Sequence, residues 1–376
     1  MKIDLASAGR EMTRITLIAH QGLNTLIVEL LTSMGVDSLI VENARCVRQK
    51  MNSRFWGFPG LNAELSDAAT EIYRLSVCRD AAPGILEKLI DRLDLRIPGR
   101  GAVYAQDLLE ITNLQPAEIK LEAAGSDSLL HDLSLITGIQ TKSGSGENLP
   151  GVALKLGVGV PVVSLGIGTG IRDRLGLLRI TISPEKELVF LMVPSHDADG
   201  LQRLLIEEGH LDRPGGGFLY QTPIRAGMVD PLIRIGRQEH AASIEQIIAA
   251  IDDLKKGTAW RKRFFGMEST SENRNETTFS HREISFFCHE GEGDSFVHAA
   301  MQAGAEGATM SRVRALYLQD GADGRSVPFE HGILCVSAAL ENDIMQALYE
   351  VAAKVENQDW ILQSLVASSV FSHKRN

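Results

Sequence analysis

The chain repeats one of its own segments, and this repeat limits its fold more than any other feature. Residues 80–106, DAAPGILEKLIDRLDLRIPGRGAVYAQ, resemble residues 196–221, HDADGLQRLLIEEGHLDRPGGGFLYQ, under a constant shift of 116 positions. A weaker third copy, residues 338–363, lies 142 positions beyond the second and has no glycines in the equivalent loop. The chain is therefore expected to contain three related units. The matching pairs of the first two copies are Gly84 and Gly200, Pro98 and Pro214, Gly99 and Gly215, Gly101 and Gly217, and Tyr104 and Tyr220.

Each copy begins after an apolar run that is typical of a strand, at residues 72–78, 187–194 and 331–338. The segment that follows has apolar residues at helical spacing, which in the first copy are Ile85, Leu86, Leu89, Ile90 and Leu93. We therefore expect each copy to form a strand, a helix, a loop that is rich in glycine in the first two copies, and a second strand.

The residues before each copy are also repeated. A shift of 269 positions aligns the region after residue 14 with the region after residue 282. Both regions predict a strand, a helix that ends at a glycine, and another strand. A middle copy would comprise a strand at residues 132–140, a short helix near 147–157 and a strand at 161–171. The aligned pairs are His20 and His289, Gly22 and Gly291, Gly35 and Gly304, and Arg45 and Arg314.

Joined together, the two halves predict an α+β fold of three ferredoxin-like βαββαβ units. The units span residues 12–112, 131–235 and 280–373. Residues 113–130 are expected to form a polar linker, and 236–279 an amphipathic helix followed by a flexible connector. Between its second and third strands each unit has an excursion, long at residues 50–70 and 172–187 and short at 320–328. Excursions of the longer kind are uncommon unless they have a function.

Composition excludes several classes of protein. The net charge of −10 argues against general affinity for nucleic acid or anionic lipid. No apolar run is long enough for a membrane span, and the first residues do not resemble a signal peptide. The four cysteines are scattered without CxxC spacing, as expected of reduced thiols. These features predict a cytoplasmic protein.

Several motifs, taken in order, resemble the nitrogen regulatory PII and PII-like signalling proteins. The motifs are ARCVRQK (44–50), IPGRGAVY (97–104), GTGIRDRLGLLRITISPEKE (168–187), RPGGGFLY (213–220) and GAEGATMSRVRA (304–315). The resemblance implies ferredoxin-like domains around nucleotide clefts, and therefore one chain folded as an intramolecular pseudo-trimer. It also implies that the long excursions correspond to partner-binding T-loops and the glycine loops to phosphate-binding B-loops.

On this resemblance the protein is expected to be a regulator rather than an enzyme. It would bind an adenine nucleotide (ATP, ADP or AMP), with magnesium possible, and act on a metabolic enzyme or membrane transporter. No nucleic-acid partner is expected, and the chain is expected to be monomeric. Gln49 matches the family glutamine that helps to bind magnesium and 2-oxoglutarate. Ala102 and Phe218 stand where the family has a phosphate-binding lysine, which favours a less charged nucleotide over ATP.

Clustered glycines let backbone N–H groups converge on an anion, and nearby arginines add charge-assisted hydrogen bonds. The alternative is that the glycines only allow a tight turn between helix and strand. Because the third copy lacks them, its cleft is expected to be inactive. The predicted nucleotide-binding residues are Arg48, Gln49, Arg96, Gly99, Arg100, Gly101, Gly168, Gly170, Arg172, Arg213, Gly215, Gly216 and Gly217.

Other chemistry is less well supported by the residues. The GIGTGI motif at residues 166–171 lacks the following helix and acidic residue of a dinucleotide fold. His20 and His289, the latter beside Cys288, lack metal-ligand spacing and are expected to start loops. Two other functions stay open: a slow nucleotide hydrolase that uses the same clefts, and a structural or metal-tolerance trimer of the CutA type.

Overall fold

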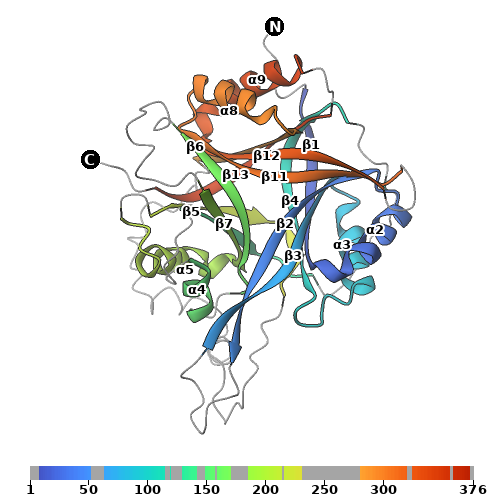
Figure 1. Ribbon diagram of the computed structural model, residues 1–376, viewed down its shortest axis with the longest axis vertical. Coiled ribbons are helices and arrows are strands. Elements are labelled where there is room, and N and C mark those ends of the chain that lie inside the picture. The colour runs from blue at the N-terminus through green and yellow to red at the C-terminus, as the bar shows by residue number, and fades with distance from the viewer. Residues whose placement is uncertain are drawn as a thin grey trace.

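The computed structural model of the chain describes residues 8–51, 63–114, 119, 129–141, 149–156, 159–170, 185–213, 216–230, 280–319, 324–355 and 359–372. Strands form the centre of the molecule, and pairs of helices lie outside them at three places (Figure 1). The predicted helix and connector at 236–279 lie outside the described residues, as do most of the excursions at 50–70 and 172–187.

We divide the described elements into three parts along the chain. The first part contains β1 (Arg10–His20), a 3-10 turn (Gln21–Leu23), α2 (Asn24–Ser33), β2 (Ser38–Met51), β3 (Ala63–Val77), α3 (Ala82–Arg92) and β4 (Gly101–Thr112). The second contains β5 (Leu133–Thr141), α4 (Leu149–Lys155), β6 (Val162–Gly170), β7 (Glu185–Pro194), α5 (Ser195–Glu208), β8 (Phe218–Ile224) and β9 (Ala226–Met228). The third contains β10 (His281–His289), α8 (Gly293–Gln302), β11 (Gly307–Tyr317), β12 (Arg325–Ser337), a 3-10 turn (Ala338–Leu340), α9 (Glu341–Ala352) and β13 (Ile361–Ser372).

Local sequence signals placed these elements well. The apolar spacing predicted a helix that is confirmed as α3, whose buried face includes Ile85, Leu89 and Ile90. Gly35 follows α2 with a φ of +81°, the left-handed conformation that commonly ends a helix. The short middle helix is α4, and Pro150 lies in its first turn, where the missing N–H of proline has no helical partner to lose.

The assembly of the elements differs from the prediction, and the expectation of three ferredoxin-like units in a pseudo-trimer is wrong. The strands of the described residues all belong to one 13-stranded sheet rather than to separate four-stranded sheets. Its pairings are antiparallel, and ten strands close into a barrel. Strands of different parts are joined directly, through the pairs β2–β6, β2–β11, β6–β11, β4–β13 and β8–β13.

The reason lies in the edge strands of each part. A strand edge presents unpaired N–H and C=O groups that must find partners. Strand β2 satisfies its outer edge twice: the stretch from Ser38 to Glu42 pairs with β11, and Arg45 and Cys46 pair with β6. Apolar periodicity shows which face of a strand is buried, but it does not show which strand lies beside it.

The helices cover the outer surface of the sheet, each pair on the strands of its own part (Figure 1). In the first part, Ile27 and Leu31 of α2 pack with Ile85 and Leu89 of α3 against Tyr73 of β3. The second and third parts have corresponding apolar clusters. Among the described residues, no helix is both long enough and apolar enough to cross a membrane.

Candidate functional site

The first glycine loop joins α3 to β4 and approaches neighbouring strands closely. Gly99 has a φ of +88° and Gly101 a φ of +147°, conformations that other residues rarely adopt. A methyl group on Gly101 would collide with the carbonyl oxygen of Ile18 in β1. A methyl group on Gly99 would lie 2.8 Å from Nη1 of Arg48. A close backbone approach therefore accounts for Gly101, and Gly99 makes room for a guanidinium.

The predicted anion-binding groups of this loop hold a carboxylate of the chain itself. The backbone N–H of Gly99 donates to Oδ1 of Asp230 over 2.7 Å. Nη2 of Arg48, on β2, donates to the carbonyl oxygen of Gly99 over 3.1 Å and lies 3.4 Å from Oδ2 of Asp230. Sequence reasoning assigned Arg48 and Gly99 to nucleotide binding, and the structure brings both of them to the Asp230 carboxylate, which leaves that assignment a prediction.

The two charged side chains differ in their access to solvent. The Asp230 side chain is 6% exposed, whereas that of Arg48 is 34% exposed. Burial raises the pKa of the Asp230 carboxyl above its usual value, although the Gly99 N–H and the Arg48 guanidinium act in the opposite direction. The carboxylate is therefore held by favourable partners in surroundings that disfavour its charge.

A small cavity of about 20 Å³ adjoins this carboxylate. It is lined by residues of the first and second parts of the chain, and Asp230 is the only charged residue among the described residues that line it. A volume of this size holds a single water molecule rather than a ring, so a larger ligand would require its walls to move. The lining residues are Ile18, Cys46, Gly101, Ala102, Leu135, Val160, Val162, Phe190, Met192, Val229 and Asp230.

The other arginines of the first loop are engaged elsewhere. Arg96 donates to Asp91 of α3 over 2.7 Å in an exposed ion pair. Arg100 lies 4.0 Å from Asp94, and its buried Nε has no hydrogen-bond partner among the described residues. The structure thus brings Arg48, Gly99 and Gly101 together, but it shows neither Arg96 nor Arg100 at Asp230.

The second glycine loop repeats the close approach of the first. Gly217 has a φ of +150°, and a methyl group on it would lie 2.8 Å from the carbonyl oxygen of Ile139 in β5. Gly216 donates its N–H to the carbonyl oxygen of Arg213, whose side chain is exposed. Gly215 lies outside the described residues. A turn and a close contact therefore account for what is described of this loop.

The remaining predicted residues lie along strands. Gly168 faces the Lys186 side chain, and Gly170 pairs with Gly307 of β11. Gln49 pairs with Leu65 in the β2–β3 ladder, but its side chain lies outside the described residues, as does Arg172. None of these positions tests the predicted contact with a nucleotide.

Sequence reasoning missed Asp230 itself. The repeat does not predict this residue, because the shift of 116 positions places Leu114 at the equivalent site. Its one signal is an acidic residue that directly follows the apolar stretch AGMV. Only the pairing of β9 with β4 brings this residue to the first glycine loop.

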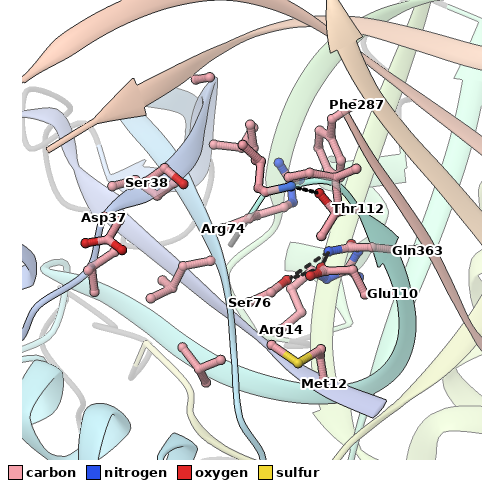
Figure 2. Close-up of a pocket in the computed structure, with 18 of the residues that line it drawn as sticks. Met12, Arg14, Asp37, Ser38, Arg74, Ser76, Glu110, Thr112, Phe287 and Gln363 are labelled. Atoms are coloured by element: carbon pink, nitrogen blue, oxygen red, sulfur yellow. Dashed lines mark hydrogen bonds between the residues drawn. The ribbon is translucent and has the colours of Figure 1, made fainter. Parts of the chain in front are cut away.

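Sequence reasoning also missed a buried polar network inside the sheet (Figure 2). Arg14 of β1 donates to Gln106, Glu283 and Gln363, over distances between 2.9 and 3.2 Å. Gln363 in turn donates to Glu110 over 2.8 Å. These side chains belong to strands of the first and third parts, so the network links segments that are far apart in the sequence.

A cavity of about 60 Å³ lies beside this network. Arg14 and Arg74 both line it, and each has its charge offset by a buried carboxylate, Glu283 and Glu42 respectively. Burial also raises the pKa of Glu110, another residue that lines this cavity, and therefore favours its uncharged form. The volume accommodates a few water molecules. The two buried arginines at this cavity are therefore each paired with a carboxylate of the chain itself.

A second buried cluster lies where β2, β6 and β11 pair with one another. His331 of β12 is 1% exposed, and its Nδ1 lies 3.7 Å from Oε2 of Glu42. Its ring stacks on that of Phe287 with centroids 4.3 Å apart. Neither ring nitrogen has a hydrogen-bond partner among the described residues, and the same is true of the Ser164 and Ser311 hydroxyls.

Because His331 is buried in this cluster, we expect the protein to lose stability in mild acid. Burial lowers the pKa of His331 below its usual value, although Glu42 opposes the shift. The unfolded chain binds a proton below pH 6.5 while the folded chain resists it, so stability should fall as the pH drops below 6.5. We expect the thermal midpoint of the wild type to decrease between pH 7.5 and 5.5, and the slope to flatten in His331→Gln. His298→Gln, at an exposed position on α8, is the matched control, and an equal slope in His331→Gln would contradict the assignment.

Comparisons with known proteins add little to this description. No protein-family model matches the chain, and no curated protein matches its sequence. Among solved structures, GlnK of B. subtilis aligns with a TM-score of 0.24 and 16% sequence identity. The alignment covers 31% of this chain and all of GlnK.

Proposed function

We propose that this protein is a regulator that binds an adenine nucleotide at Arg48 and Gly99 and thereby changes its affinity for a partner. The observation that carries the proposal is the hold of these two groups on a carboxylate, beside a cavity with mainly apolar walls. A backbone N–H and a guanidinium that bind a carboxylate also suit a phosphate oxygen. An apolar cavity beside an anion site suits a ligand with a ring at one end and a phosphate at the other, provided that the walls of this cavity of about 20 Å³ move apart to admit the ring.

The position of Arg48 supports a regulatory role. Arg48 lies on β2, two residues before Lys50, where the sequence predicts the first partner-binding excursion. A ligand that contacts Arg48 would act on the strand that leads into this segment. Coupling of this kind between two sites is typically about 1–3 kcal/mol.

The loop chemistry favours a nucleotide of low charge. The first loop has Ala102 where the related family has a lysine, so the described site offers one arginine and one backbone N–H. These two donor groups suit a ligand with one or two phosphate groups better than a triphosphate. We therefore expect AMP or ADP to bind more tightly than ATP, and we expect any magnesium to be supplied with the nucleotide.

Calorimetric titration with ATP, ADP, AMP and cyclic AMP tests this function. We expect saturable binding, weakened about tenfold or more in Arg48→Ala because a hydrogen bond to a charged group is lost. Arg203→Ala, which removes an exposed arginine on α5, is the matched control and should bind like the wild type. Following phosphate release in the same samples distinguishes a sensor from a hydrolase.

The outcome that overturns the proposal is equally definite. If neither the wild type nor the Asp230→Asn variant binds any of the four nucleotides, the protein is not a nucleotide sensor. Binding that is equally strong in Arg48→Ala would show a nucleotide site elsewhere.

A further inference from the structure

Asp230 occupies the place that the proposed function gives to a phosphate. Its carboxylate accepts the Gly99 N–H over 2.7 Å, a distance typical of a charge-assisted hydrogen bond. It also lines the adjacent cavity, so one side chain contacts both the anion-binding groups and the cavity. A phosphate could not reach the Gly99 N–H while this carboxylate is bound to it.

The contacts of Asp230 with its two partners are unequal. Nη2 of Arg48 lies 3.4 Å from Oδ2 of Asp230, longer than the 2.7–2.9 Å of a strong charge-assisted pair. The same nitrogen donates to the Gly99 carbonyl oxygen at 3.1 Å. The Arg48 side chain is one-third exposed, so a ligand can approach it from solvent. The ion pair is thus loose enough for a better anion to replace it.

The charge of the carboxylate acts on any ligand that enters. A negative group brought beside Asp230 meets like charge in surroundings that screen it poorly, and this repulsion weakens its binding. Only a ligand whose anionic group takes over the bonds of Asp230 avoids this repulsion. An uncharged ligand meets no such requirement.

We propose that Asp230 determines which ligands the site accepts, by occupying the position of the anionic group until a ligand phosphate displaces it from Gly99 and Arg48. The inference rests on the proposed function, because it concerns the same site. It goes beyond it by assigning the selection among ligands to one residue, which acts as an internal competitor of the phosphate.

The test compares AMP with adenosine, which lacks the phosphate. Asp230→Asn keeps the shape of the side chain and removes its charge. We expect this variant to bind AMP about tenfold more tightly than the wild type does and to bind adenosine unchanged. Asp230→Ser also removes the charge and should show the same changes in affinity. It replaces Asp230→Asn in the test if that variant does not fold. Asp343→Asn, at an exposed position on α9, removes the same charge from the chain and should change neither affinity.

Each outcome separates this inference from the proposed function. Tighter binding of AMP alone supports the competitor role, whether or not the wild type binds measurably. Binding of AMP by the wild type that is equal or weaker in both variants overturns the competitor role and leaves the nucleotide function standing. An equal gain for adenosine overturns it as well, because charge would not be the cause. If neither the wild type nor any variant binds AMP, both the competitor role and the proposed nucleotide function are overturned.

Discussion

Arg74→Met should lower the free energy of unfolding by about 3–5 kcal/mol, because it leaves a buried carboxylate without its cation. Nη1 of Arg74 lies 2.6 Å from Oε2 of Glu42, and the two side chains are 8% and 2% exposed. Burial alone would raise the pKa of Glu42, but Arg74 and then His331 hold it well below its usual range. Without Arg74, Glu42 must either stay charged in the interior or bind a proton at neutral pH.

Chemical denaturation at pH 7 measures this loss. Arg312→Met removes an arginine that is 85% exposed and 3.7 Å from Glu290, and it should cost less than about 1 kcal/mol. The double variant Arg74→Met/Glu42→Leu should recover most of the loss, since it removes both charges. A single variant that is as stable as the wild type, or a double variant no better than the single, would show that the pair does not act as a unit.

The contribution of Glu42 also has a defined pH window. Because its folded-state pKa is lowered, the stabilisation is fully present above the unfolded value of about 4.5 and is lost as the pH falls below it. The same experiment at pH 4 should therefore find a smaller difference between wild type and Arg74→Met than at pH 7.

Gly101→Ala should destabilise the protein by about 3 kcal/mol or more, through backbone strain and a collision with Ile18. Gly101 has a φ of +147°, and the obstacle is the carbonyl oxygen of a central strand, which cannot turn away as a side chain can. Gly200→Ala is the matched control. Gly200 lies inside α5 with open space around it, so alanine there should stabilise the helix by up to about 1 kcal/mol.

Thermal unfolding of the two variants decides between two roles for Gly101. A large loss in Gly101→Ala, opposite in sign to the effect of Gly200→Ala, supports a structural role. If Gly101→Ala were as stable as the wild type and lost only nucleotide binding, the close approach to Ile18 would not be the reason for this glycine.

Prediction from the sequence succeeded where the cause is local. The helical face of Ile85, Leu89 and Ile90 follows from spacing along one helix. The positive φ of Gly35 follows from its place just beyond α2. The repeat singled out Gly101 and Gly217 as phosphate-binding or turn glycines, and the structure shows that each faces a carbonyl oxygen of the neighbouring strand.

Prediction failed where the cause is a partner distant in the sequence. The pairing of β2 with β6 and β11 turned the expected separate units into one closed sheet. The same limit applies to the site, since Asp230 is 131 positions from Gly99. No local pattern at either residue indicates the other.

By itself the sequence therefore determined the helices and the strands, and it identified the glycine loops as unusual places in the backbone. Spacing and conformational preference act within a few residues, so they can be recognised along the chain. Only the tertiary structure decided how the strands join, which buried charges balance one another, and which group holds the anion-binding loop. Hydrogen bonds between strand edges and ion pairs in the interior depend on proximity in space, which the order of residues does not disclose.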